Sequence, residues 1–199
     1  MINNNLNSIG SIELPLSKEL IRPKFSFYKR PIRNSIPQKA VTLWEIYELI
    51  RSDCYKWQTD KLRTLTDIDK AKSFKRENFD YVTASGIFTY REVKSLSQHS
   101  GLLAIDLDEL PNVKEIKNAM IEDKWLEPDL AFISPSGRGV KLIVSIDLQF
   151  ANHLDWFMSI SNFIKTTYKL DVDPTGKDVS RAVFLGQDSE AFINPKHIQ

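Results

Sequence analysis

Two aspartates spaced for metal binding stand at the end of an apolar stretch of the chain. The stretch reads Gly101-Leu102-Leu103-Ala104-Ile105-Asp106-Leu107-Asp108. Side chains two residues apart on a β-strand point to the same face, with Cα atoms ~6.6 Å apart. Asp106 and Asp108 would then project together and could ligate a hard divalent cation such as Mg²⁺ or Mn²⁺. The simpler alternative is a strand end with two solvated acids that lead into the turn at residues 109–112.

A second segment combines two glycines with a serine and two basic side chains. It reads Phe132-Ile133-Ser134-Pro135-Ser136-Gly137-Arg138-Gly139-Val140-Lys141. Such glycines let backbone N–H groups turn toward an anion, and Arg138 and Lys141 supply positive charge. The spacing is neither that of a Walker A loop nor that of the dinucleotide fingerprint, and a strand follows it. A bound phosphate would therefore lie over a sheet. The alternative is an ordinary hairpin turn with glycine at positive φ.

A third segment supplies further acids and then an arginine before a strand. It reads Leu170-Asp171-Val172-Asp173-Pro174-Thr175-Gly176-Lys177-Asp178-Val179-Ser180-Arg181. One of the three aspartates could complete a metal site, and Arg181 could bind a triphosphate or a template phosphate. Alternatively, Asp178 and Arg181 form a local salt bridge in an acidic loop.

Hydrophobic periodicity predicts the elements that must position these segments. Thr42-Leu43-Trp44-Glu45 has capping-box spacing and should start a helix. Further helices are expected at residues 67–76, 112–122 and 154–168. In the second of these, Val113, Ile116, Ala119 and Met120 should form the inner face. Strands are expected at residues 81–90 (strand, turn, strand), 102–108, 130–133, 140–146 and 182–185. This irregular alternation predicts an α+β fold with a mixed or antiparallel sheet.

Residues 18–39 are strongly basic, with aromatic side chains among the charges. The segment contains a single acid, Glu19, and seven basic residues: Lys18, Arg22, Lys24, Lys29, Arg30, Arg33 and Lys39. Phe25, Phe27 and Tyr28 are interleaved with them. This segment could clamp phosphates and stack bases. Equally, it could be an edge strand that buries its aromatic side chains while Lys and Arg protect the edge.

Bulk composition indicates one globular domain without a membrane span. The chain has 199 residues, of which 42 % are hydrophobic, and a net charge of +1. Residues 1–99 carry a balance of +6 and residues 100–199 a balance of −5, which suits a surface for a polyanion beside a surface for cations. The single cysteine excludes an internal disulfide. Residues 1–17 are Asn- and Ser-rich and are expected to be poorly ordered, without a secretory signal, so a cytoplasmic location is expected.

In their order and separation, the three chemical segments resemble motifs I, II and III of the archaeo-eukaryotic primase-polymerase superfamily. The chain is most similar to the VirE N-terminal, or BT4734-like N-terminal, domains of bacterial mobile elements and phages. The hallmarks of these domains appear here as Ser85-Gly86-Ile87-Phe88 with Arg91, as His99-Ser100-Gly101-Leu102-Leu103, as Ser134-Pro135-Ser136-Gly137-Arg138-Gly139-Val140-Lys141 and as Lys177-Asp178-Val179-Ser180-Arg181. The resemblance covers roughly residues 40–195.

This resemblance implies a set of residue roles and a fold. Asp106, Asp108 and Asp173 would bind catalytic Mg²⁺ or Mn²⁺. The nucleotide-binding residues would be Ser136, Gly137, Gly139, Lys141 and Arg181. An RRM-like catalytic sheet (residues 100–199) would pack against an N-terminal basic α/β lobe (residues 18–99) within a single domain, residues 18–199. Many active primases have histidine where this chain has Lys141, and a lysine cannot accept a hydrogen bond from a substrate.

The resulting hypothesis is template-directed nucleotidyl transfer in the replication of a mobile element or phage. The partners would be a DNA template or primer, (d)NTPs and a helicase domain or protein. The alternative is a catalytically inactive module that binds nucleic acid or nucleotides and associates with a replicative helicase. A nuclease or relaxase is a poorer interpretation because His99, His153 and His197 are widely separated single residues.

Overall fold

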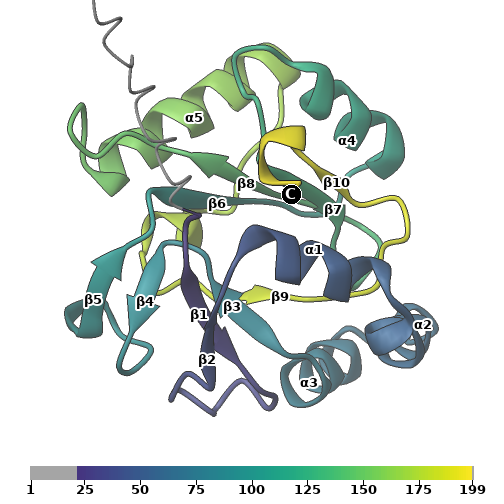
Figure 1. The fold of residues 1–199 in the computed structure, drawn as a ribbon. Coiled ribbons are helices and arrows are strands. Elements are labelled where there is room, and N and C mark those ends of the chain that lie inside the picture. Colours follow the sequence, from purple (N-terminus) through teal and green to yellow (C-terminus); the bar gives the residue numbers. More distant parts are fainter. Residues whose placement is uncertain (1–21, 199) are drawn as a thin grey trace, which may run out of the picture.

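Two four-stranded antiparallel sheets face each other in the computed structural model, which describes residues 22–198. Helices α4 and α5 cover the outer face of the central sheet, and its inner face packs against an N-terminal layer (Figure 1). The predicted α+β class is therefore confirmed. Residues 1–17, which we expected to be poorly ordered, lie outside the described part of the chain.

The N-terminal layer contains one sheet, three helices and a small two-stranded sheet. Its main sheet has the order β2-β1-β3-β9, formed by β1 (Phe25–Tyr28), β2 (Lys39–Val41), β3 (Tyr81–Thr83) and β9 (Val183–Phe184). The helices are α1 (Leu43–Arg51), α2 (Lys56–Arg63) and α3 (Ile68–Asn78), with a 3₁₀ turn, η1, at Asp53–Tyr55. The small sheet pairs β4 (Gly86–Phe88) with β5 (Leu96–His99), and η2 (Val93–Ser95) lies between them.

The central sheet carries the three chemical segments. Its order is β10-β7-β8-β6, formed by β6 (Leu102–Leu107), β7 (Leu130–Ile133), β8 (Val140–Ser145) and β10 (Phe192–Ile193). The remaining elements are α4 (Val113–Glu122), α5 (His153–Tyr168), η3 (Pro174–Lys177) and η4 (Pro195–His197). No helix within residues 22–198 combines the length and apolar character that crossing a membrane requires.

Alternation along β6 determines which layer the acids face. Leu103, Ile105 and Leu107 belong to the core under α4 and α5. Leu102 belongs to the core shared with the N-terminal layer, and Ala104 packs against that core. Because successive strand residues point to opposite faces, Asp106 must point toward the N-terminal layer. The acids therefore lie between the two layers and not on the outer surface of the sheet.

Several predicted elements are confirmed, and two details are wrong. The capping box forms: Thr42 Oγ1 accepts from Glu45 N, and Glu45 Oε2 accepts from Thr42 N. The strands predicted within residues 81–90 exist, but β3 pairs with β1 and β9 whereas β4 pairs with β5. On α4, Ala119 is exposed and Lys117 is buried instead, because a buried carboxylate lies within its reach.

Within the described part of the basic aromatic segment, Phe25–Tyr28 form an interior strand, and residues 18–21 lie outside the described residues. β1 lies between β2 and β3, and Phe25, Phe27 and Tyr28 are at most 2 % exposed. The prediction that bases stack on these rings is therefore wrong. The alternative prediction of an edge strand is wrong in its position, but its burial of the aromatic side chains is confirmed. β1 is hydrogen-bonded along both edges, to β2 (residues 39–41) on one side and to β3 (residues 81–83) on the other.

Asp188 joins three parts of the fold just behind the glycine segment. Its Oδ2 accepts from Ile133 N at 2.8 Å and from Lys117 Nζ at 3.2 Å, and its own N–H donates to Ile50 O at 3.0 Å. The Lys117 and Asp188 side chains are 2 % and 6 % exposed. This carboxylate thus fixes the end of β7, from which the Ser134–Gly139 turn begins.

Replacing Asp188 with alanine should lower the free energy of unfolding by about 3–5 kcal/mol, because it leaves the buried Lys117 ammonium without its counter-charge. Urea denaturation measures the change. The control is Glu190→Gln, which removes the exposed Lys114–Glu190 pair and should change stability little. Equal effects of the two substitutions would contradict this account of the buried pair.

Two histidines that are far apart in sequence contact each other between β5 and the start of α5. His99 Nε2 lies 3.1 Å from His153 Nδ1. Gly101 N–H donates to His99 Nδ1 at 3.0 Å, so a neutral His99 carries its proton on Nε2 and donates to His153. Burial, together with the neighbouring His153, lowers the pKa of His99 to about 4.

The folded protein should therefore lose stability as the pH falls from ~6.5 to 4. Over this range the unfolded chain protonates His99 at its ordinary pKa of ~6.5 while the folded chain leaves it neutral, so protons favour unfolding. The His99→Asn variant, whose Oδ1 can replace Nδ1 as acceptor, should show a shallower loss. Urea denaturation at about pH 7 and about pH 5 tests this, and identical losses would refute it.

Candidate metal centre

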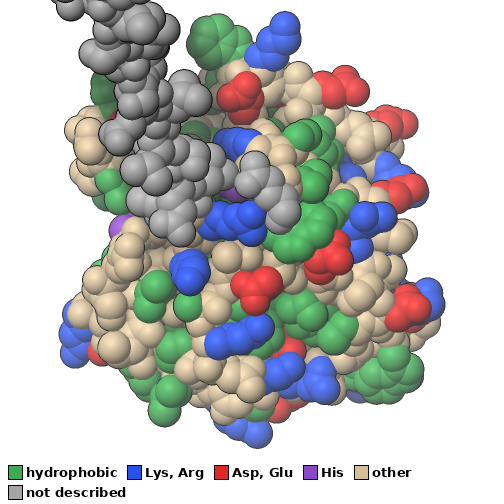
Figure 2. All heavy atoms as spheres, in the orientation of Figure 1, with side chains coloured by type: hydrophobic (Ala, Val, Ile, Leu, Met, Phe, Trp, Pro, Cys, Tyr) green, Lys and Arg blue, Asp and Glu red, His purple; other side chains and the backbone are tan. Residues whose placement is uncertain are grey.

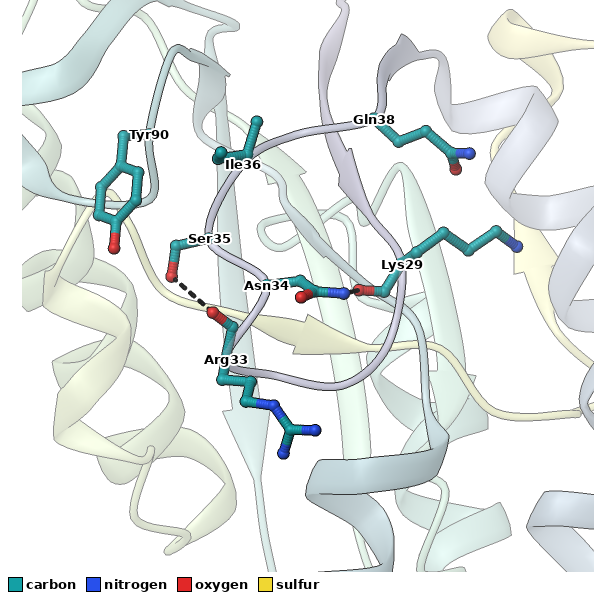
Figure 3. Close-up of a pocket in the computed structure, with 7 residues that line it drawn as sticks. All are labelled: Lys29, Arg33, Asn34, Ser35, Ile36, Gln38 and Tyr90. Carbon is teal, nitrogen blue, oxygen red and sulfur yellow. Dashed lines mark hydrogen bonds between the residues drawn. The ribbon is translucent and has the colours of Figure 1, made fainter.

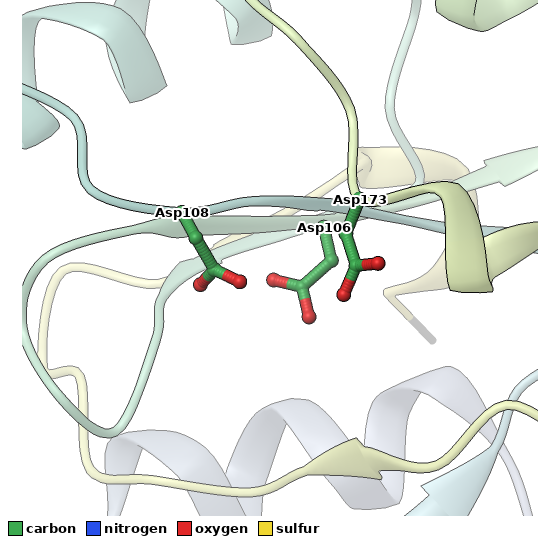
Figure 4. Close-up of side chains that lie close together, drawn as sticks. All are labelled: Asp106, Asp108 and Asp173. Atoms are coloured by element: carbon green, nitrogen blue, oxygen red, sulfur yellow. The ribbon is translucent and has the colours of Figure 1, made fainter. Parts of the chain in front are cut away.

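Three aspartates converge at the inner face of the central sheet. One carboxylate oxygen from each of Asp106, Asp108 and Asp173 lies within 4.8 Å of the others. Figure 4 shows all three carboxylates directed to the same side of the backbone that carries them. Asp106 is buried, Asp173 is half-buried and Asp108 is exposed at the cleft wall. The expectation that Asp106 and Asp108 project together, and that a third acid joins them, therefore matches the geometry.

The strand register places a lysine directly opposite the buried acid. Asp106 on β6 is the cross-strand neighbour of Lys141 on β8. Lys141 Nζ donates to Asp106 Oδ2, and both side chains are largely buried. Cross-strand neighbours lie about 5 Å apart at Cβ, so a long lysine side chain reaches the carboxylate easily.

The third acid is Asp173, and hydrogen bonds of its backbone and its side chain hold it in place. Its N–H donates to Asp106 O at 2.9 Å, which ties the loop before η3 to β6. Its Oδ1 accepts from Thr175 N at 2.9 Å and its Oδ2 from Arg181 Nη2 at 2.6 Å. The two other candidate acids are used elsewhere: Asp171 pairs with Lys165, and Asp178 accepts from Ser180.

The charges of the site shift its acids in opposite directions. Burial alone would raise the pKa of Asp106, but Lys141 and Arg181 hold that pKa below its usual value. Desolvation by the surrounding protein is the main cause that raises the pKa of Asp108, and the negative charge of Asp106 raises it further. Arg181 Nη2 lies 3.4 Å from Asp106 Oδ2 as well as bonding Asp173, so one guanidinium serves two acids. The alternative interpretation, a local salt bridge between Asp178 and Arg181, does not match the structure, since the Arg181 side chain pairs with Asp106 and Asp173.

Basic residues from the N-terminal layer face these acids across a cleft of about 460 Å³. The opposing wall carries Lys75 and Arg76 of α3 and Arg91, which stacks its guanidinium over Tyr81 at 5.1 Å. Burial is the main cause that lowers the pKa of Lys75, followed by the repulsion of Lys141. Sequence reasoning noticed Arg91 only within a hallmark and missed Lys75 and Arg76, because their position depends on how the two layers pack.

The serine–glycine turn lies beside the acids, but its glycines mainly serve packing. Gly137 has φ +77°, and its N–H donates to Ser134 O at 2.8 Å, so this amide is not directed at a ligand. A Cβ on Gly139 would overlap Leu107 O and lie 3.1 Å from Asp108 Oδ1. Ser136 and Arg138 line a hollow next to Asp108. The glycines therefore allow β8 to start close against the end of β6.

A separate hollow of about 320 Å³ lies over the loop between β1 and β2 (Figure 3). Lys29, Arg33 and Tyr90 line it. Its two cations are partly neutralised, since Lys29 pairs with Asp80 and Arg33 with Glu77, each at 3.0 Å. On the face shown in Figure 2, basic and acidic side chains are interspersed and do not divide into one basic and one acidic surface.

The comparison with protein families supports one assignment. The family model described as the BT4734-like, N-terminal domain matches residues 73–192 of this chain. The chain belongs to the BT4734-like N-terminal domain family. No curated protein and no solved structure matches it significantly. Within this BT4734-like domain, the family match contains the three acids, the glycine turn and Arg181, whereas α2 and the first turn of α3 precede it.

Replacing Gly139 with alanine should disturb Asp108 directly. The added methyl group overlaps Leu107 O, so we expect the free energy of unfolding to fall by about 1–3 kcal/mol as the hairpin shifts. The shift should also weaken Mn²⁺ binding, which isothermal titration calorimetry can measure. Gly137→Ala is the control for strain in the turn: alanine at φ +77° is also unfavourable, but its methyl group meets the Arg63 side chain and not Asp108, so Mn²⁺ binding should change less. Unchanged Mn²⁺ binding by the Gly139→Ala variant would show that the turn does not position the acid.

Proposed function

We propose that this BT4734-like domain is a metal-dependent, primase-polymerase-like nucleotidyltransferase that acts in the replication of a mobile element or phage. Its substrates would be (d)NTPs and a DNA template or primer, with a helicase domain or protein as a further partner. The observation that carries the proposal is the convergence of Asp106, Asp108 and Asp173 within 4.8 Å at a cleft lined by basic side chains.

The donor set suits Mg²⁺ or Mn²⁺. All three candidate ligands are carboxylates, which hard divalent cations prefer. Asp106 Oδ1 is buried without a hydrogen-bond partner among the described residues, and a cation would satisfy it. When bound there, such a cation would activate the attacking hydroxyl and stabilise negative charge on the leaving pyrophosphate.

The chain's own side chains would orient and neutralise the triphosphate. Lys141 on β8 and Arg181 on the segment that leads into β9 balance the acids. Lys75, Arg76 and Arg91 add positive charge from the opposite wall of the cleft. Phosphates entering between the walls would meet preorganised cations from both layers, which is the main contribution a protein makes to phosphoryl transfer.

The topology also supports a primase-like interpretation. β6, α4, β7, β8 and α5 follow the β-α-β-β-α order of a split βαβ unit, and β8 lies antiparallel between β6 and β7. The fourth strand, β10, pairs with β7, whereas the fourth strand of an RRM pairs with the first, so the support comes from β6, β7, β8 and the two helices. An RRM-like catalytic sheet beside an N-terminal α/β layer is the arrangement that the resemblance to primases implied.

One observation favours a second candidate, a catalytically inactive module that binds nucleotides or nucleic acid. Lys141 occupies the position of the histidine found in many active primases, and it binds Asp106 directly. A lysine that competes with a cation for this carboxylate would weaken metal binding. Filter binding of single-stranded DNA with and without Mn²⁺ separates the two candidates: metal-independent binding without nucleotide incorporation supports the inactive module.

The Asp106→Asn/Asp108→Asn double variant should abolish Mn²⁺-dependent primer synthesis and extension. Since changes to residues that only support metal ligands cost about 10–100-fold, loss of two ligands should cost more than ~100-fold. The assay uses labelled NTPs and dNTPs with Mg²⁺ and with Mn²⁺. Asp171→Asn is the matched control, since this exposed acid pairs with Lys165 away from the cluster. A double variant that extends primers at the wild-type rate would refute the proposal.

A further inference from the structure

A second hollow, of about 640 Å³, adjoins the basic cleft next to the acids. Lys75 and Asp108 line both spaces, so the two adjoin each other at these side chains. One wall of this second hollow is the end of α2 and the start of α3. The other wall is the segment around Glu109 and the turn that carries Ser136 and Arg138. We call this space the α3 groove.

The wall formed by α3 is a helix face that is open at its N-terminal end, while Lys75 further along lies over the Phe184 ring at 5.5 Å. Ile68, Ala71, Lys72 and Lys75 line the groove at the spacing i, i+3, i+4, i+7, which places them on one face. No side chain of α3 is fully buried, and Ile68 is 64 % exposed. Asp67 caps the helix by accepting from the N–H groups of Asp69 and Lys70, which stabilises its first turn.

The groove and the cleft differ in chemistry. Five basic side chains line the cleft: Lys75, Arg76, Arg91, Lys141 and Arg181. The groove has fewer unpaired charges: it presents Leu62, Leu65, Ile68 and Ala71 beside Lys72, and its Arg138 is paired with Glu109 at 3.0 Å. A ligand that fits both spaces has a polyanionic end joined to an uncharged, largely apolar end.

We propose that the α3 groove holds the base and sugar of the incoming nucleoside triphosphate while its phosphates lie in the cleft. This inference rests on the proposed function and names the residues that would recognise the nucleoside: Ile68 and Ala71 would contact the base and the sugar. The volume of the groove falls within the range of about 300–1,000 Å³ typical of small-molecule sites. These two residues precede the segment matched by the family model.

The test compares dATP with tripolyphosphate, which has the phosphates but no nucleoside. Both are titrated calorimetrically into the protein in the presence of Mn²⁺. The wild type should bind dATP more tightly. Ala71→Phe should fill the groove and weaken dATP binding at least ~10-fold, with tripolyphosphate binding unchanged. Ile68→Asp, a substitution at an exposed position that the fold should tolerate, should also weaken dATP binding selectively.

Ala119→Phe is the matched control, since Ala119 is exposed on α4 and lines neither space. It should leave both affinities unchanged. If the two α3 variants bind dATP like the wild type, or lose affinity for both ligands equally, the groove assignment is wrong while the proposed function stands. If the wild type binds neither ligand with Mn²⁺, the proposed function itself fails, and the groove assignment fails with it.

Discussion

A carboxylate buried between two protein layers has to be balanced by positive charge, and Asp106 imposes this requirement on the whole site. The balance comes from Lys141, directly across the β6–β8 ladder, and from Arg181, which binds Asp173 as well. These pairs allow three carboxylates to share a small volume although like charges repel at such distances. The residue at position 141 therefore sets the charge of the site as directly as the acids do.

Close packing of the glycine turn is the second condition for this arrangement. Gly139 lies against Leu107 O, so β8 can begin beside the end of β6 and keep Lys141 in register with Asp106. Asp188 fixes the other side of the turn through Ile133. The glycines in this segment thus act on the acids through backbone proximity, and contacts to phosphates would fall to side chains from both layers.

Local patterns predicted the acids, helices α1, α3, α4 and α5 and the α+β class, because strand alternation and helix periodicity depend on neighbouring residues. They missed α2, whose residues Lys56–Arg63 include few apolar side chains. Asp106 and Asp108 could be paired from their spacing alone. The contacts between remote segments could not be predicted: Lys117 with Asp188, His99 with His153, and Lys75 facing the acids all depend on how the layers pack. The interior position of β1 was missed for the same reason, since its charged flanks resemble an edge and nothing local identifies its two partners.

The chain between Asp173 and β9 couples the two layers at the site. Asp173 is bound to β6 through its N–H, and Val183 pairs with β3 in the N-terminal sheet. Arg181 lies between these two attachments and bonds both Asp106 and Asp173. One short segment therefore joins the acids to the layer that carries Lys75 and Arg91, and Arg181 is held at the site from both layers. The distance between the acidic and basic walls of the cleft is thus set by this segment as well as by the hydrophobic cores under each wall.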